Sequence, residues 1–408
     1  QKYLEEFNVR IVLTAHPTQF YPGSVLGIIT DLTEAIRQND LLRINDLLAQ
    51  LGKTPFFKHK KPTPYDEAVS LIWYLENVFY KSFGSIYDYI QQNIFDGKPI
   101  ENDILNIGFW PGGDRDGNPF VTPEITLNVA NRLRETIIKN YYRDTRQLKR
   151  KLTFKGVEEK IIALESELYK IITNKKSDLT LDNFISELKE IKEIVVKHHQ
   201  SLYVSEVNSL LNKTHLFGFH FANLDIRQDS RKHSQFFNHI VDASIKSGTK
   251  LFPKNYYDLS EVEQIQILSK IKGSIDLTLI KDEETLMALN TIKVIRKIQE
   301  TNGEKAANRY IISNNQTALN VMQLFAMLKL VAFDDQLTVD IGPLFETISD
   351  LENAPSIMEE LYTNAEYAAH LISRGNKQTI MLGFSDGTKD GGYLMANWAI
   401  YKAKEALT

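Results

Sequence analysis

Two hydrophobic patterns alternate along the chain, and the first is helical. Long segments carry apolar residues at steps of three and four, the period of an amphipathic helix. Thr122, Pro123 and Glu124 form a typical helix start, with a capping hydroxyl, a proline in the first turn and an early acid. Helices are predicted over residues 62–91, 122–152, 157–172, 181–211, 283–299, 317–331 and 349–374.

The second pattern consists of short apolar runs between the helices, each followed by polar residues and then by another helix. These runs lie within residues 9–18, 106–119, 218–230, 309–317, 338–347 and 379–392. Repeated strand, loop and helix units predict an α/β fold with parallel strands. In barrels built from such units, the chemistry lies on the loops that follow the carboxyl ends of the strands.

The loop after the second apolar run has an unusual composition. Residues 109–121 read FWPGGDRDGNPFV, with three glycines, two prolines and three charged side chains. Asp-Gly and Asn-Pro pairs favour turns, so a surface turn with solvated charges is the ordinary interpretation. Its position after a strand predicts instead that it belongs to an active-site rim.

The other strand ends also supply polar side chains. Together the six loops offer His16; Asp114, Arg115, Asp116 and Asn118; Asp225, Arg227, Gln228 and Asp229; Asn314 and Asn315; Glu346; and Ser385, Asp386 and Lys389. Cations together with carboxylates suit an anionic substrate bound through a hard divalent ion, since Mg²⁺ prefers oxygen ligands. A single carboxylate after a strand is often only the N-cap of the next helix, so that alternative stays open for Glu346 and Asp386.

Composition narrows the class of protein. The 408 residues are 43% hydrophobic and 25% charged, as in a large globular protein, and 48 basic against 52 acidic residues leave a net charge of -4. That balance gives no general attraction to nucleic acid or to an anionic membrane. The absence of cysteine excludes disulfides and thiolate sites. The loop GFSDGTKDGG lacks the residue order of a nucleotide phosphate loop.

Five motifs together resemble one enzyme family. LTAHPTQ (13–19), WPGGDRDGNP (110–119), LDIRQDS (224–230), PLFET (343–347) and GFSDGTKDGG (383–392) resemble the motifs of phosphoenolpyruvate carboxylase, in the same order and over nearly the whole chain. The resemblance implies a mostly helical α/β protein on a TIM-like barrel of eight strands, of which this chain carries six. It also implies carboxylation of phosphoenolpyruvate by bicarbonate to oxaloacetate and phosphate, with Mg²⁺ or Mn²⁺ as cofactor.

The resemblance also assigns roles to residues. It implies that His16 and Lys389 are catalytic, that Arg227 is both catalytic and substrate-binding, and that Trp110 forms an aromatic wall near the substrate. Glu346 and Asp386 match the family's metal ligands. We further expect Arg115 among the substrate-binding residues, and Asp114 and Arg115 to stiffen their loop through ion pairs. In the implied reaction, attack of bicarbonate gives carboxyphosphate and enolate, and His16 takes the carboxyphosphate proton.

The same resemblance suggests how much of the family's protein is present. Residues 1–408 match the central part of one barrel domain, with helical insertions at about 27–104, 123–215 and 232–305. The chain lacks an initiator Met and the family's glycine- and arginine-rich mobile loop, so we expect an inactive fragment of a longer protein. Gln19 and Pro22-Gly23 depart from the family pattern near His16. The parent is expected to be a cytoplasmic, allosteric homotetramer that replenishes the tricarboxylic acid cycle by carbon dioxide fixation.

Two alternatives remain at this point. One is another Mg²⁺-dependent barrel enzyme that uses phosphoenolpyruvate or an oxoacid, since a fold hosts many functions. The other is a non-catalytic fragment.

Overall fold

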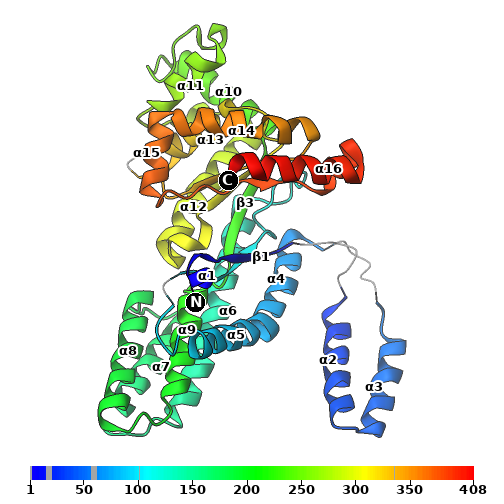
Figure 1. Cartoon of the computed structure of the whole chain (residues 1–408), viewed down its shortest axis with the longest axis vertical. Coiled ribbons are helices and arrows are strands. Elements are labelled where there is room, and N and C mark those ends of the chain that lie inside the picture. Colours follow the sequence, from blue (N-terminus) through cyan, green and yellow to red (C-terminus); the bar gives the residue numbers. More distant parts are fainter. Residues whose placement is uncertain (1, 15–20, 57–61, 101, 335) are drawn as a thin grey trace.

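The centre of the molecule is a curled sheet of six parallel strands, seen in a computed structural model that describes residues 2–14, 21–56, 62–100, 102–334 and 336–408 (Figure 1). The strands are paired in chain order. They are β1 (Val9–Leu13), β2 (Leu105–Phe109), β3 (Asn223–Asp229), β4 (Arg309–Ser313), β5 (Asp340–Phe345) and β6 (Met381–Leu382). All six predicted strands are confirmed, and the sheet is an incomplete α/β barrel within a mostly helical protein.

The register places the carboxyl ends of the strands at one edge of the sheet. Leu13 is paired with Phe109, and Phe109 with Leu224 on β3. Because every pair is parallel, the six loops that follow the strands leave from the same side. Successive side chains point to opposite faces, so Leu224 and Ile226 lie in the hydrophobic core while Asp225 and Arg227 lie on the other face of β3.

Helices before β3 form the lower part of the view in Figure 1. The region predicted as one helix over 62–91 is a continuous run of α4 (Pro64–Tyr74), a π-helical turn (Leu75–Phe79) and α5 (Tyr80–Asn93). α6 (Pro123–Lys149) begins as predicted, with Thr122 accepting a hydrogen bond from the Ile125 amide. The other members are the short α1 (Lys2–Glu6), α7 (Glu158–Ile172), α8 (Leu181–His198) and α9 (Val204–Phe217).

One predicted helix is wrong in its extent. The pattern over 181–211 predicts a single helix, but α8 ends at His198 and α9 begins at Val204. Gln200, Ser201 and Tyr203 adopt positive φ values of 51°, 59° and 61°, which a right-handed helix cannot contain. The apolar period continues across this turn because both helices bury residues in the same core.

The later helices form the upper part of the view. They are α10 (Ser230–Ser247), α11 (Glu261–Ser269), α12 (Glu283–Asn302), α13 (Ala318–Val331), α14 (Ile348–Thr363), α15 (Ala365–Ser373) and α16 (Ser385–Leu407), with 3₁₀ turns at Tyr256–Asp258, Leu277–Leu279 and Glu304–Ala307. Asn364 separates α14 from α15 within the region predicted as one helix, and its side chain accepts from the Tyr367 amide.

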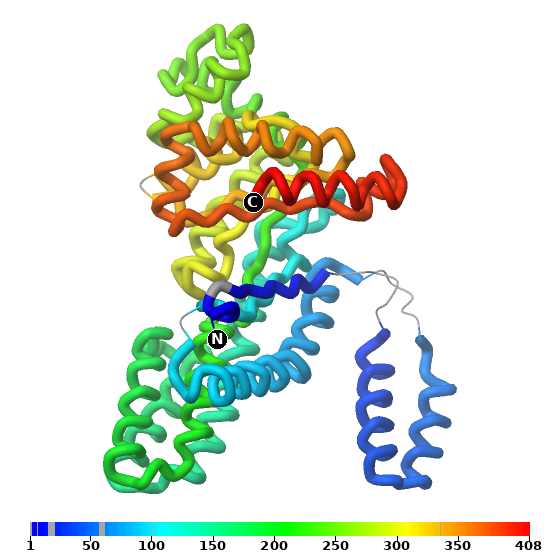
Figure 2. Tube along the Cα trace, in the orientation of Figure 1, coloured from blue at the N-terminus to red at the C-terminus, as the bar shows by residue number. Residues whose placement is uncertain are grey.

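A helical hairpin stands apart from the rest of the tube in Figure 2. It consists of α2 (Gly23–Arg37) and α3 (Leu41–Lys53), which lie largely within the helical insertion expected at about 27–104, although neither was predicted as a separate helix. Ile28, Ala35 and Leu47 form a small core of its own, separate from the main one.

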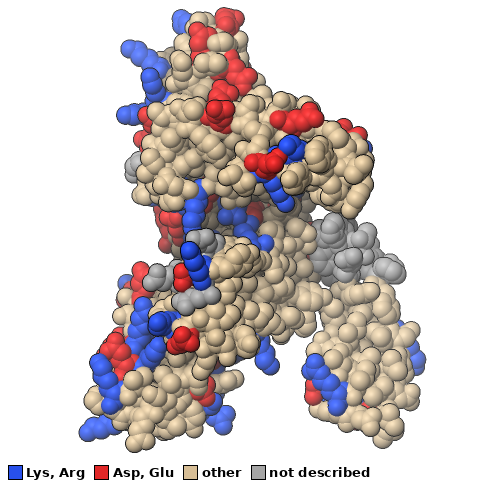
Figure 3. All heavy atoms as spheres, in the orientation of Figure 1, with Lys and Arg blue, Asp and Glu red and all other residues tan. Residues whose placement is uncertain are grey.

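The surface agrees with the near-neutral composition. Basic and acidic side chains are interspersed on the face shown in Figure 3, and neither sign covers it. Within the described part of the chain, no helix has both the length and the apolar character needed to cross a membrane.

Candidate active site

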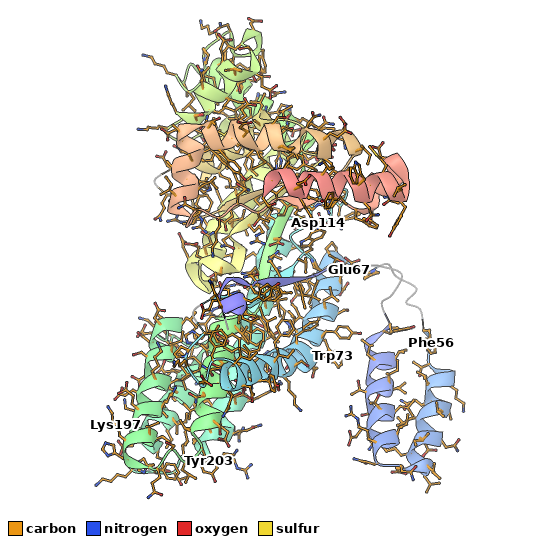
Figure 4. The ribbon with its side chains drawn as sticks, viewed as in Figure 1. Phe56, Glu67, Trp73, Asp114, Lys197 and Tyr203 are labelled. Carbon is orange, nitrogen blue, oxygen red and sulfur yellow. The ribbon has the colours of Figure 1, made fainter. Side chains whose placement is uncertain are left out.

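A pocket opens at the carboxyl ends of the first strands. Its volume is about 320 Å³, and it is lined by Thr14, Pro64, Glu67, Trp110, Pro111, Gly112, Asp114, Asp116, Asn118, Val121 and Arg227. Most of the lining comes from the loop after β2, while α4 contributes Glu67, which lies beside this loop in Figure 4. The charged loop identified in the sequence is therefore a wall of the pocket and not an isolated surface turn.

The loop after β2 is fastened to β3 through its backbone. Asp114 and Arg227 form a parallel β-bridge, in which the Arg115 amide donates to the Arg227 carbonyl at 2.9 Å and the Arg227 amide donates to the Gly113 carbonyl at 3.1 Å. Gly113 makes this approach feasible, because a Cβ there would lie 2.1 Å from the Asp225 carbonyl oxygen. Gly112 supplies the turn, with a φ of +83° that favours glycine.

Arg227 is the central cation of the site. Its guanidinium lies 2.8 Å from Asp116, 3.3 Å from Asp114 and 3.5 Å from Glu346. The guanidinium carbon is also 5.0 Å from the centre of the Trp110 ring, within the range of a cation–π contact. The side chain is only 16% exposed, and among the described residues its buried Nε has no acceptor.

Burial changes the acidity of two carboxyls around Arg227. It raises the pKa of Asp114 to about 6, although the Arg227 charge acts in the opposite direction. Burial also raises the pKa of Glu346, where Arg227 and a hydrogen bond from the Asn314 amide oppose the effect and the negative charge of Asp386 adds to it. In both carboxyls, burial favours the neutral form while the nearby Arg227 cation favours the charged form.

Glu346 and Asp386 are not helix caps, which decides the alternative left open by the sequence. Thr347 caps α14 in a reciprocal capping box with Asp350. Asp386 lies in the first turn of α16, whose N-cap position is Phe384. β5 and β6 are neighbouring strands, so Glu346 and Asp386 follow adjacent carboxyl ends, and the negative charge of Asp386 contributes to the raised pKa of Glu346.

Lys389 lies at the outer side of this region. Its Nζ donates to Asp386 at 2.6 Å, and the lysine and aspartate side chains are 76% and 50% exposed. The hydrogen bond to Asp386 raises the pKa of Lys389, so the ammonium is favoured.

Arg115 points away from Arg227 and into the protein. It is 6% exposed, and its guanidinium donates to the Thr291 hydroxyl at 2.9 Å. Burial lowers its pKa. Asp114 forms the ion pair expected of it, but the expected ion pair of Arg115 is wrong: no carboxylate lies within ion-pair distance of Arg115 in the described ranges.

The structure therefore gathers Trp110 and Glu346 around the Arg227 guanidinium, with Asp386 and Lys389 after the neighbouring strand β6. His16 and Gln19 lie outside the described residues. Sequence reasoning did not assign a role to Asp116, which Arg227 contacts most closely of its three carboxylates. It also missed Arg10, although a charged residue within an otherwise apolar strand is a feature that could have identified it.

Known proteins resemble this chain along its whole length. The sequence model of the family "Phosphoenolpyruvate carboxylase" matches residues 1–180 and 157–408, which together cover the whole chain. The phosphoenolpyruvate carboxylase of Nitrosomonas eutropha is 27% identical, with 100% of this chain and 50% of that protein aligned. The enzyme of Shewanella loihica is 29% identical over 99% of this chain and 50% of its own length.

A further relative from Prochlorococcus marinus is 26% identical and is covered over 49% of its length. The chain thus spans about half the length of the curated relatives that it matches. The motifs quoted from the sequence, the βα topology and the full-length family match all lead to one assignment. The chain belongs to the phosphoenolpyruvate carboxylase family.

Proposed function

We propose that this chain supplies most of the active-site rim of a phosphoenolpyruvate carboxylase, a lyase that joins bicarbonate to phosphoenolpyruvate and yields oxaloacetate and phosphate. The observation that carries the proposal is the position of Arg227, held by three carboxylates and by Trp110 at the carboxyl ends of parallel strands. A buried arginine in a pocket is suited to bind phosphate or carboxylate oxygens. Family membership makes phosphoenolpyruvate the anion of choice.

The residues present fit a divalent cation, Mg²⁺ or Mn²⁺. Glu346 and Asp386 repel each other electrostatically, and a cation between them would remove that repulsion. The described residues contain no group of three or more His, Cys, Asp and Glu side chains placed to hold a metal. Two carboxylates are nevertheless enough for a Mg²⁺ site whose other ligands are water and substrate. When bound there, the ion would stabilise negative charge on substrate oxygens.

The protein's own side chains would each have a distinct role in the reaction. Arg227 would orient the phosphoryl group and stabilise charge that develops on its oxygens. The ring of Trp110 would cover the apolar edge of the substrate and limit the access of water to the enolate. The Lys389 ammonium would add positive charge at the outer side, and His16 would accept the proton of carboxyphosphate.

We infer that efficient turnover belongs to a longer polypeptide. Six strands leave both edges of the sheet without a strand partner in the described residues, and the relatives are about twice as long. An enolate exposed to water would be protonated to pyruvate instead of being carboxylated.

The test is an assay with phosphoenolpyruvate, bicarbonate and Mg²⁺, following oxaloacetate and pyruvate separately. The longer protein that carries this segment should form oxaloacetate only when bicarbonate is present, and the 408-residue chain should be much slower and release pyruvate. Oxaloacetate formation independent of bicarbonate, or none by the longer protein, would contradict the proposal.

A further inference from the structure

A chain of hydrogen bonds connects three strands behind Arg227. Arg10 on β1 donates from both terminal nitrogens to the two oxygens of Asp225 on β3, at 2.8 and 2.6 Å. The indole N–H of Trp110, which follows β2, donates to the same carboxylate at 3.1 Å. The Asp225 side chain is 1% exposed and that of Arg10 17%, so the contact is well shielded from water.

The sheet provides space for this contact. Arg10 must cross β2 to reach β3, and it does so over Gly108. A Cβ at Gly108 would lie 2.7 Å from the guanidinium carbon of Arg10. Gly108 has no positive φ, so its role here is not that of a turn: a side chain at this position would displace the Arg10 guanidinium.

The contact controls the orientation of the Trp110 ring. The backbone of Trp110 is fixed independently, because its amide donates to the Leu13 carbonyl at 3.0 Å. The side chain can still rotate about its own bonds, and the bond to Asp225 selects one orientation. In that orientation the ring faces the Arg227 guanidinium, whose nitrogens also contact the three carboxylates.

We propose that Arg10 and Asp225 are positioning residues, which fix the Trp110 ring and through it the Arg227 guanidinium for the reaction inferred above. The inference rests on the proposed function and adds residues to it. Neither side chain lines the pocket, so neither is expected to touch substrate. Their effect would pass through the indole N–H alone.

The variant Trp110→Phe gives the sharpest test, because it keeps an aromatic ring and the Arg10–Asp225 pair but removes the N–H. In the longer protein, we expect Trp110→Phe and Asp225→Asn each to reduce kcat/KM for phosphoenolpyruvate by about tenfold or more, since small displacements of binding groups are costly. The double variant should be no worse than the poorer single variant, because both changes break one interaction. Additive losses, or single variants with unaltered kcat/KM, would overturn the proposal.

A matched control separates positioning from general stability. Asp340→Asn breaks a comparable ion pair, in which Arg374 lies 2.6 Å from a β5 aspartate that has no bond to Trp110. It should lower the melting temperature and leave KM and kcat for phosphoenolpyruvate unchanged. An equal kinetic loss in this control would assign the Asp225 effect to stability and contradict positioning.

A spectroscopic measurement on the 408-residue chain does not depend on activity. Phenylalanine at Trp73 and Trp398 leaves Trp110 as the one tryptophan of the sequence. We expect Arg10→Lys to preserve the emission maximum and the acrylamide quenching, because the carboxylate of Asp225 stays in place. Asp225→Asn should change both, because its single amide oxygen replaces the two carboxylate oxygens that Arg10 and the indole N–H share. An unchanged spectrum in a folded Asp225→Asn variant would reject the role of Asp225. If the unmodified longer protein lacks carboxylase activity, the proposed function is wrong. The fluorescence measurement would still test whether Asp225 fixes the Trp110 ring.

Discussion

Arg227 on β3 and Glu346 after β5 approach to 3.5 Å, although 119 positions separate them in the sequence (346 − 227). β4 lies between their strands, so the contact crosses the carboxyl edge of the sheet. It connects the loop after β2 to the pair of acids at β5 and β6, because the same guanidinium also contacts Asp114 and Asp116. Arg227 therefore belongs to the proposed anion site and also contacts Glu346 of the proposed metal site.

This shared position predicts a large effect of Arg227→Lys. A lysine keeps the charge but cannot present a planar fork to three carboxylates and an aromatic face. We expect kcat/KM of the longer protein to fall by about 10²–10³, the loss typical of one transition-state donor. Steady-state kinetics measures it. Arg231→Lys is the matched control, since this neighbouring arginine is 78% exposed and pairs only with Asp229 among the described residues; a similar loss there would show that the effect is not specific.

The proposed metal site predicts weaker Mn²⁺ binding when either acid is neutralised. Glu346→Gln and Asp386→Asn remove one carboxylate each but preserve shape, so we expect affinity to fall more than about tenfold. Titration followed by the electron paramagnetic resonance signal of free Mn²⁺ tests this without any assay of activity. Glu352→Gln, at an exposed position on α14, controls for general charge. Unchanged affinity in both variants would refute the assignment.

The raised pKa of Asp114 predicts a pH-dependent stability. The pKa is about 6 in the folded chain against 3.8 for an ordinary aspartate, so between these pH values the folded state holds more protons than the unfolded state. The free energy of unfolding of the native chain therefore falls as pH rises through this window. Asp114→Asn cannot titrate, so its stability relative to the native chain should rise between about pH 4 and 6 and then level off.

The size of that rise is about 1–3 kcal/mol, since one pKa unit corresponds to about 1.4 kcal/mol. Urea unfolding of both proteins at a series of pH values measures it. The exposed Asp46→Asn on α3 serves as the comparison. A stability difference between Asp114→Asn and the native chain that is constant from pH 4 to 7 would contradict the pKa shift.

The exposed position of Lys389 predicts that its replacement affects activity but not stability. Its pair with Asp386 is exposed, and such pairs contribute little to folding. Lys389→Gln should leave the melting temperature unchanged and reduce kcat of the longer protein clearly. Lys402→Gln breaks a similar pair with Glu405 on the same helix and should affect neither quantity. Equal kcat in Lys389→Gln and the unmodified protein would remove Lys389 from the catalytic set.

The sequence predicted the strands well because each is a short apolar run with a polar end, a local feature of the chain. It predicted the ends of helices less well where a turn lies inside a continuous apolar pattern, as between His198 and Val204. Helices α2 and α3 were not predicted individually within the helical insertion expected at about 27–104, because they bury few residues. Several of their large apolar side chains, such as Leu42 at 82%, remain exposed.

The sequence predicted which residues form the site better than it predicted the contacts between them. Polar residues placed at strand ends indicated Arg227, Glu346 and Asp386, because strand ends converge in any parallel sheet. Arg227 was expected in the loop after its strand, but it lies within β3, which extends to Asp229. The direction of Arg115 was not predictable, since two adjacent charged residues in one loop can point to opposite sides. Only the fold shows that Asp114 pairs with Arg227 while the Arg115 guanidinium reaches Thr291 in the interior.

The close approach at Gly113 restricts how this protein can evolve. A side chain of any size would strike the Asp225 carbonyl, so no other amino acid is compatible with the bridge between the loop and β3. Any descendant that keeps the bridge must keep a glycine at this point. The constraint on this residue is one of backbone geometry, because it comes from the Asp225 carbonyl and not from any group that would meet substrate.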